Sequence, residues 1–194
     1  MAGTAESASE GAAVPAGAKQ ASSMLARDWG WVDRTIWTER MLAALDNGVQ
    51  GGKWFSLIDK VSRPQTLTVA WQQVQANGGA AGIDGQSVGR LAAQAERYLG
   101  ELAEALKTGR YRAAPVRRVE IAKADGKTRP LGIPTVKDRI VQTAVKRVIE
   151  PIFENVFLPT SYGFRPGRSG KDALREVDRL LRAGFTHVVD ADLK

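Results

Sequence analysis

The sequence contains no cysteine and only one histidine, His187, among its 194 residues. It therefore has no disulfide, no thiolate metal ligand and no cysteine nucleophile, and a multi-histidine metal site is excluded as well. No stretch approaches the roughly 20 apolar residues that cross a bilayer, and the N-terminus lacks the charged start and apolar run of a signal peptide. We therefore expect a soluble, cytoplasmic protein with no membrane partner.

Basic residues are in excess and unevenly distributed. The chain has 28 Lys and Arg against 21 Asp and Glu, a formal charge of +7. Residues 1–106 contain 9 basic and 11 acidic side chains, whereas residues 107–194 contain 19 and 10. Clustered cations gain affinity for a polyanion by releasing its counterions, so the second half is expected to face a polyanion, with a plain solvated surface as the alternative.

The first half combines a low-complexity start with helical patterns. Residues 1–23 are rich in Ala, Gly and Ser and are expected to be a disordered tail. Apolar spacing predicts helices over 31–46, 66–76 and 91–107, the first broken by Gly48, Gly51 and Gly52 and the last closed by Gly109. The five tryptophans all precede residue 72, and their spacing favours a core over a base-stacking surface.

A glycine-rich loop spans residues 77–85, with four glycines in nine positions. It lacks the G-x-x-x-x-G-K-[ST] pattern of a nucleotide cradle, so a P-loop is rejected. Its glycines would let the backbone approach a ligand closely, while a plain flexible connection is the alternative.

Two alternating segments, 116–123 and 127–133, predict a β-hairpin, and Pro130 makes the second strand an edge strand. A two-residue turn would place Lys123 opposite Thr128. A three-residue loop over 124–126, with a left-handed Gly126, would place Lys123 opposite Lys127 and Ile121 opposite Arg129. The second register puts Lys123, Lys127 and Arg129 on one face, where they suit a phosphate group; an ordinary solvated tip is the alternative.

Two capping patterns predict helices in the second half. Thr135 with Asp138 begins one that runs to about residue 149 and is ended by Pro151. Ser169 with Asp172 begins another, stopped by Gly184, whose inward-facing residues are Leu174, Val177, Leu180 and Leu181.

Two further segments carry candidate chemistry. The loop 161–169 interleaves Tyr162 and Phe164 with Arg165 and Arg168, a composition that suits single-stranded nucleic acid, although the rings could equally anchor the loop. Residues 185–193 predict a half-buried strand with Asp190 and Asp192 on one face. Such a pair suggests a divalent-cation site, with exposed acids at a strand end as the alternative, whereas His187 on the opposite face is expected in the core.

Taken in order, these motifs resemble the group II intron-encoded reverse transcriptases, or intron maturases. The resemblance covers about residues 77–194 and rests on several quoted runs: G82-I-D-G85, Y111-R-A-A-P-V-R-R-V-E-I-A-K-A-D-G-K-T-R-P-L-G-I133, D138-R-I-V-Q142, E150-P-I-F-E154, S161-Y-G-F-R-P-G-R-S169 and V188-V-D-A-D-L-K194. It implies an α+β fold: a helical N-terminal extension (24–106), right-hand polymerase fingers (107–184) and the first strand of a truncated palm (185–194). Retron or CRISPR-associated reverse transcriptases are ranked lower.

The resemblance also implies roles for individual residues. Asp192 would be the catalytic metal ligand for Mg²⁺, with Asp190 a neighbouring acid, and Lys123, Arg129 and Lys127 would bind the triphosphate of an incoming deoxynucleotide. Template or intron RNA would lie along a larger set of residues: Gly78, Gly79, Gly82, Arg112, Arg117, Arg118, Tyr162, Phe164, Arg165 and Arg168. The remaining acidic ligands of the family lie downstream of Lys194, so this chain alone is expected to be an inactive fragment of an RNA-directed DNA polymerase that copies RNA from a DNA primer and assists splicing. A catalytically dead RNA-binding fragment or remnant is the alternative.

Overall fold

The computed structural model describes residues 29–47, 56–124 and 126–192. Within these ranges the chain forms helices and one antiparallel hairpin: α1 (Glu39–Asp46), α2 (Ile58–Val61), α3 (Pro64–Asn77), α4 (Val88–Ala92), α5 (Ala95–Lys107), β1 (Arg117–Ala122), β2 (Thr128–Ile133), α6 (Val136–Glu154) and α7 (Gly170–Arg182). This mixture confirms the α+β class. The tail over 1–23 lies outside the described residues, as do Gly48, Gly51, Gly52 and Trp54.

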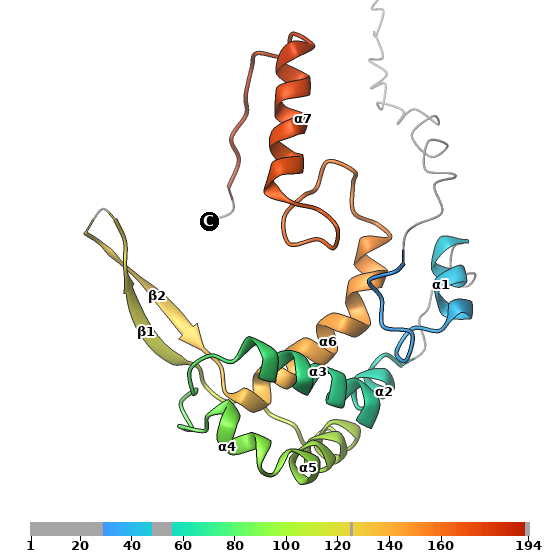
Figure 1. Ribbon diagram of the computed structural model, residues 1–194, viewed down its shortest axis with the longest axis vertical. Helices are drawn as coiled ribbons and strands as arrows, with labels where there is room; N and C mark the ends of the chain where they lie inside the picture. The colour runs from blue at the N-terminus through green and yellow to red at the C-terminus, as the bar shows by residue number, and fades with distance from the viewer. Residues whose placement is uncertain (1–28, 48–55, 125, 193–194) are drawn as a thin grey trace, which may run out of the picture.

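The core forms where α3 packs on α6, with α2, α4 and α5 around them (Figure 1). Leu67 of α3, Leu102 of α5 and Ile140 of α6 are each at most 2% exposed. Burying one such side chain contributes about 1.5–3 kcal/mol. Because α6 supplies one side of this core, the helical N-terminal half and the basic second half fold together.

The segment before α1 is buried but only partly helical. Trp29, Trp37 and Trp71 are in the core, as the sequence favoured, but Trp31 is exposed. The prediction of helix over 31–46 is wrong for residues 31–37, which form turns. The Asp33 carboxylate accepts hydrogen bonds from the Thr35 backbone N–H (2.9 Å) and hydroxyl (2.7 Å), and such local bonds compete with a helix.

The helix predicted over 91–107 is divided into α4 and α5. Gln94, at φ −132°, leaves the helical region between them. The apolar face is nevertheless as predicted, since Leu91, Leu102 and Leu106 are buried. Gly109 ends the segment with φ +66°, a conformation that favours glycine.

Pro151 does not end α6, contrary to the sequence prediction. The helix continues through Pro151 to Glu154, although proline removes one backbone hydrogen bond. Tertiary packing compensates: Pro151 is fully buried, and the Asn155 side chain donates to the carbonyl of Leu45 (3.0 Å). The predicted start is confirmed, because the Thr135 hydroxyl accepts from the Asp138 backbone N–H (3.1 Å).

The C-terminal elements differ most from expectation. The capping box of Ser169 and Asp172 begins α7 as predicted. However, Leu174, Val177 and Leu181 are more than half exposed and Leu180 is only partly buried, so the inward orientation is wrong for this chain. Residues 185–192 form no strand, and His187, Asp190 and Asp192 are exposed rather than half-buried or in the core. A strand needs a hydrogen-bonded neighbour, and no other described segment pairs with this one.

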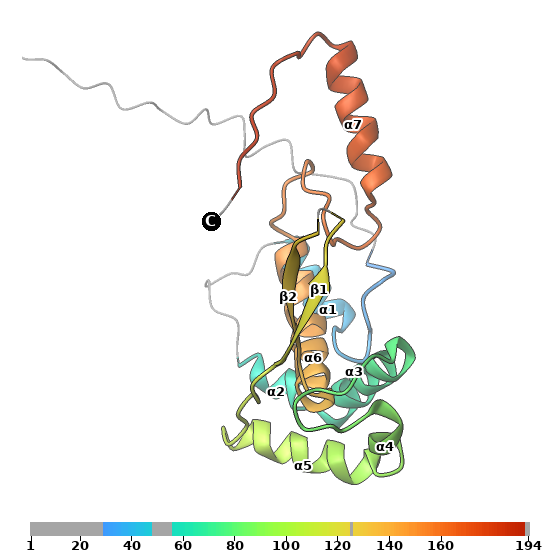
Figure 2. The same ribbon diagram turned by 90° about the vertical axis from the view of Figure 1, so that its left-hand side faces the viewer.

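The β-hairpin extends away from the helical core in Figure 1, and Figure 2 shows it in front of α6. Among the described residues, no helix is both long and apolar enough to span a membrane.

Candidate nucleic-acid interface

The hairpin adopts the three-residue loop. Ile121 lies opposite Arg129 and Ala122 opposite Thr128, which excludes the two-residue turn. At the tip, the Lys123 backbone N–H donates to the carbonyl of Lys127 (2.6 Å) and Gly126 has φ +78°. Since side chains alternate along a strand, Lys123, Lys127 and Arg129 project from one face.

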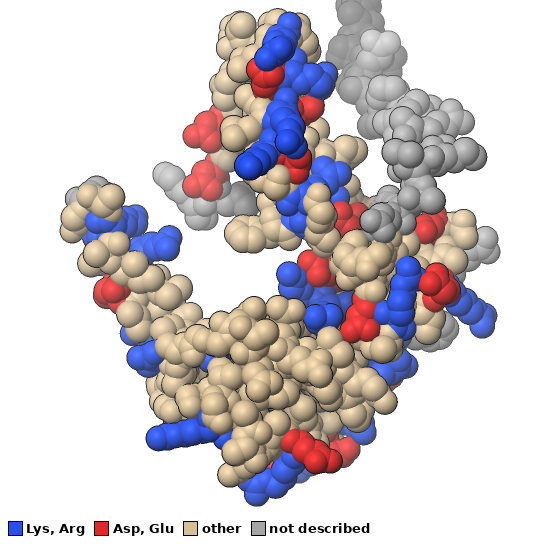
Figure 3. All heavy atoms as spheres, viewed as in Figure 1, with Lys and Arg blue, Asp and Glu red and all other residues tan. Residues whose placement is uncertain are grey.

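Cations gather near the hairpin tip (Figure 3). Lys123 and Arg129 are exposed and make no ion pair with the described residues. Arg118, from the opposite face, is paired with Glu120 (2.8 Å). At the base of the hairpin, Arg117 donates to the Ala81 carbonyl (3.0 Å). The same-face trio at the tip is therefore the part of the hairpin best suited to an anion.

The glycine-rich loop is docked onto the N-terminus of α6. Arg139 donates to the carbonyls of Gly78 (2.8 Å) and Ala80 (2.9 Å). Gly82 is buried: a Cβ there would lie 2.7 Å from the Thr135 backbone, and one on Gly79 would lie 2.9 Å from the Arg139 guanidinium. The close approach that Gly82 allows is to the protein itself, so Gly82 has a packing role that the sequence did not indicate.

A buried carboxylate on α6 holds the segment that leads into the hairpin. Asp138 is 2% exposed and accepts from the Tyr111 hydroxyl (2.5 Å), the Thr135 hydroxyl (2.7 Å) and the Ala114 backbone N–H (3.2 Å). Burial, and then the bond to Asp138, raises the pKa of Tyr111 well above its ordinary value. The neighbouring Arg112 donates to the carbonyls of Gly109 and Tyr111 (2.8 and 2.7 Å). These bonds fix the chain that leads into β1.

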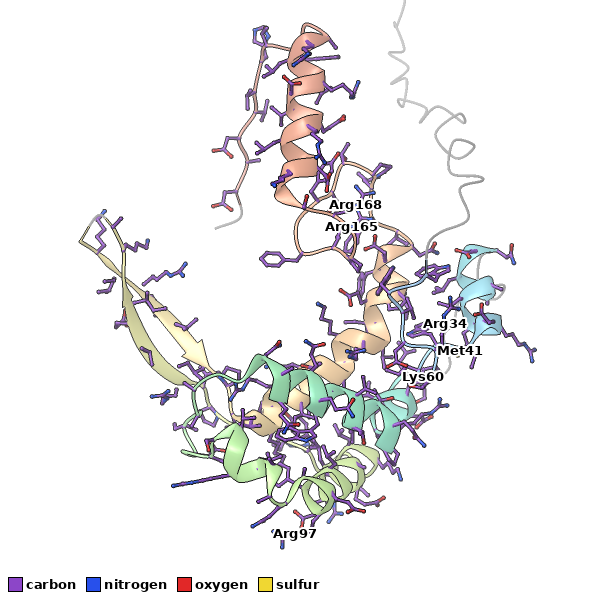
Figure 4. The ribbon with its side chains drawn as sticks, in the orientation of Figure 1. Arg34, Met41, Lys60, Arg97, Arg165 and Arg168 are labelled. Carbon is purple, nitrogen blue, oxygen red and sulfur yellow. The ribbon has the colours of Figure 1, made fainter. Side chains whose placement is uncertain are left out.

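Arg165 is an interior residue, which its place in the aromatic and arginine loop did not predict. Its side chain is 6% exposed and its Nε donates to both carboxylate oxygens of Glu154 (3.0 and 3.1 Å). Its Nη1 donates to the carbonyls of Leu158 and Ser161, each at 2.7 Å. Arg165 therefore organises the loop between α6 and α7, where Figure 4 labels it beside Arg168.

The other members of this loop are more accessible. Arg168 lies over the Tyr162 ring (5.4 Å) and donates to the carbonyls of Pro159 and Ser161. Phe164 is fully exposed and has φ +56°, a conformation rare outside glycine. The loop thus exposes the Phe164 side chain, while hydrogen bonds from Arg165 and Arg168 hold the rest of the loop in place.

The acidic pair does not form a metal site in the described part of the chain. Asp190 and Asp192 lie in the exposed segment after α7, and no group of three or more potential ligands occurs among residues 29–47, 56–124 and 126–192. Hard divalent cations need several oxygen ligands, so these two carboxylates are insufficient by themselves.

Two residues that hold the candidate interface in place were not singled out from the sequence. Arg139 lies inside the D138-R-I-V-Q142 run, but only the structure shows that it holds the glycine loop. Tyr111 lies in another quoted run, and its spacing of 27 residues from Asp138 gives no local signal of their contact.

Comparison with known proteins indicates the class of protein to which the second half of the chain is similar. Residues 121–194 match the family described as reverse transcriptase (RNA-dependent DNA polymerase). This part of the chain is therefore reverse transcriptase sequence, and it includes most of the hairpin, α6 and α7.

Similar proteins narrow the class. Protein YkfC of Escherichia coli is 41% identical over 143 residues, which are 71% of this chain and 38% of that protein. Group II intron-encoded protein LtrA of Lactococcus lactis is 39% identical over 135 residues, 68% of this chain and 22% of LtrA. The Saccharomyces cerevisiae putative COX1/OXI3 intron 1 protein is 35% identical over 97 residues, 50% of this chain and 12% of that protein. The resemblance to group II intron-encoded reverse transcriptases and maturases is thus confirmed, and the chain spans well under half the length of these relatives.

Proposed function

We propose that this chain is the RNA-binding fingers region, with its helical N-terminal extension, of a group II intron reverse transcriptase and maturase. In the complete protein, the region would bind intron RNA and the template and help to position a deoxynucleotide triphosphate at the end of a DNA primer. The observation that carries this proposal is the hairpin register, which puts Lys123, Lys127 and Arg129 on one exposed face within the matched family region.

The hairpin trio suits a phosphate for simple electrostatic reasons. The Arg129 guanidinium can bind a phosphate through two parallel hydrogen bonds, whereas Lys123 supplies a compact charge. In a complete polymerase the two would neutralise the triphosphate as charge develops during transfer. Catalysis would also need divalent metal, for which we propose Mg²⁺ with Asp192 as one ligand and Asp190 nearby, completed by acidic residues outside this chain.

RNA binding by the chain itself tests the proposal. We would measure the affinity for a labelled group II intron RNA and for an unstructured RNA by fluorescence anisotropy across a salt series. Each phosphate that the protein no longer neutralises lowers the slope of log affinity against log salt by about 0.7 on single strands. With no deoxynucleotide bound, Lys123 and Arg129 would be available to RNA phosphates, so the double substitution Lys123→Gln with Arg129→Gln should lower the slope for the unstructured RNA by about 1.4.

The matched control is Lys107→Gln on α5, whose ammonium pairs with Glu104 (3.2 Å). It should leave the slope unchanged. Wild-type RNA binding that is insensitive to salt, or a slope that is equal in the hairpin double variant and wild type, would contradict the assignment of Lys123 and Arg129 to phosphate binding. Primer extension by the chain alone would contradict its expected inactivity.

A further inference from the structure

A hollow of about 310 Å³ lies where the segment 29–37 passes α3 and α6. This volume is at the lower end of the ~300–1,000 Å³ typical of small-ligand sites. The hollow is distinct from the hairpin tip, and Figure 1 shows the segment running beside α6. The hairpin and the α6–α7 loop contribute none of its lining residues.

Trp31 gives the hollow an open aromatic wall. Trp31 is 36% exposed, whereas the neighbouring Trp29 and Trp37 are at most 7% exposed. The Trp31 ring is tilted by 44° against Trp29, with centroids 6.0 Å apart, so Trp29 supports it from within the fold. A supported and partly exposed indole offers a face on which a flat group can stack.

The charges around the hollow are already compensated. Arg147 lies 3.6 Å from the Asp33 carboxylate, and Lys146 lies 3.4 Å from that of Glu150. A phosphate entering here would meet two carboxylates together with the two cations. The hollow therefore favours a neutral group over an anion.

The polar groups offer both hydrogen-bond donors and acceptors. Gln73 is held in place, since its Oε1 accepts from Arg147 (3.2 Å) and its Nε2 donates to Asn77 Oδ1 (3.3 Å). Asn77 and Glu150 both line the hollow. Asn77 uses its Oδ1 in the bond to Gln73, and its NH₂ group makes no hydrogen bond with the described residues. A planar partner with both acceptors and N–H donors on its edge fits this combination.

We propose that the hollow binds one unpaired nucleobase of a single-stranded RNA, stacked on Trp31 with its polar edge toward Asn77 and Glu150. This proposal rests on the proposed RNA-binding function and adds to it a base-binding site away from the hairpin. In this proposal the α3–α6 face stacks on a base and the hairpin binds phosphate. RNA binding at the hairpin should therefore depend on salt, and binding at the α3–α6 face should depend on the presence of the base.

Fluorescence of 2-aminopurine tests the stacking directly. We would place this base at successive positions of an unstructured RNA of about 16 nucleotides, the upper site size of common single-strand binders. At one position, binding to the wild-type chain should quench the fluorescence. Trp31→Ala should abolish that quenching and weaken affinity about 5- to 140-fold, the range expected for one base–aromatic stack, whereas Trp31→Phe should retain most of both.

Two further variants separate a base from a phosphate. Asn77→Ala, at the exposed end of α3, should weaken binding of the base-containing RNA but leave an oligonucleotide with an abasic residue at the quenched position unaffected. In Lys146→Gln, the slope of log affinity against log salt should equal that of the control Lys107→Gln. A slope lowered by about 0.7 in Lys146→Gln alone would show a phosphate contact and overturn the assignment. Thermal unfolding of every variant confirms that each one folds.

The outcomes distinguish this inference from the proposed function. If RNA binds but quenching is the same in wild type and Trp31→Ala, the base site is refuted and RNA binding stands. If the wild-type chain binds no RNA, both proposals fail. If sedimentation shows that the wild-type chain dimerises at the concentrations used and that Trp31→Ala is monomeric, the Trp31 face contacts a second copy of the chain and the base site is refuted.

Discussion

Breaking the Arg165–Glu154 pair should destabilise the loop between α6 and α7. The two side chains are 6% and 14% exposed, and Arg165 also satisfies the carbonyls of Leu158 and Ser161. Arg165→Ala would remove the Arg165 hydrogen bonds to the largely buried Glu154 carboxylate and to these two carbonyls. Removing one partner of a buried ion pair costs about 3–5 kcal/mol, a large part of a typical stability of about 5–15 kcal/mol.

Native-state amide exchange measures this destabilisation locally. The Ser161 and Arg168 amides are hydrogen-bonded to carbonyls within the loop, and their exchange should report its opening. Urea unfolding followed by circular dichroism gives the global value. Glu154→Gln should destabilise the same loop, and the double variant should be destabilised by much less than the sum of the two single variants, because the residues act as a pair.

Asp178→Asn is the control for this experiment, because it removes the exposed pair of Asp178 and Arg182 on α7 (2.9 Å). Its effect should stay below about 1 kcal/mol. The reasoning is refuted if the loop amides are as well protected in Arg165→Ala as in Asp178→Asn. It is also refuted if Arg165→Ala lowers RNA affinity without any change in loop exchange, since Arg165 would then act at the RNA surface.

Three further predictions concern the contacts of α6 and the acidic pair after α7. Because the pKa of Tyr111 is raised in the folded state, its stabilising contribution is present below pH 10 and should be lost as the pH rises above 10. In urea unfolding, the free energy of unfolding of Tyr111→Phe should fall less steeply above pH 10 than that of wild type. Some loss should remain, because the pKa of Tyr98 is raised too. Gly82→Ala should destabilise by about 1–3 kcal/mol because its Cβ would collide with the Thr135 backbone, whereas Gly100→Ala, in open space within α5, should be neutral or stabilising; equal effects would contradict the packing. Added Mn²⁺ should leave the thermal unfolding midpoint unchanged in both wild type and Asp192→Asn, and a metal-dependent rise that disappears in the variant would show that this chain completes a site.

Local sequence signals predicted local structure well. The residue pairs Thr135/Asp138 and Ser169/Asp172 begin α6 and α7, and Gly126 sets the hairpin register that places Lys123 opposite Lys127. Each signal involves residues a few positions apart, whose geometry is determined largely by the backbone between them. The prediction of a helix over 31–37 was wrong for an equally local reason, because the Asp33 carboxylate accepts hydrogen bonds from Thr35.

Contacts between residues far apart in the sequence could not be predicted from the sequence pattern. Gly82 meets Thr135 across 53 positions of intervening chain, and Arg139 reaches Gly78 across 61. Neither periodicity nor composition encodes such pairs. The same holds for α7, where an amphipathic pattern predicts a buried face but does not supply the element that would cover it.

The arginines show how much of the basic excess the fold itself uses. Arg117 and Arg139 secure the glycine loop, Arg112 secures the chain before β1, and Arg165 secures the α6–α7 loop. A guanidinium has several donors in a fixed plane, so it can satisfy loop carbonyls that a helix or strand would otherwise pair. Arg165 is thereby largely buried, whereas Arg112 and Arg117 remain exposed and keep their charge. The salt dependence of RNA binding should therefore reflect the exposed cations, with Lys123 and Arg129 foremost, and not all 19 basic residues counted over 107–194.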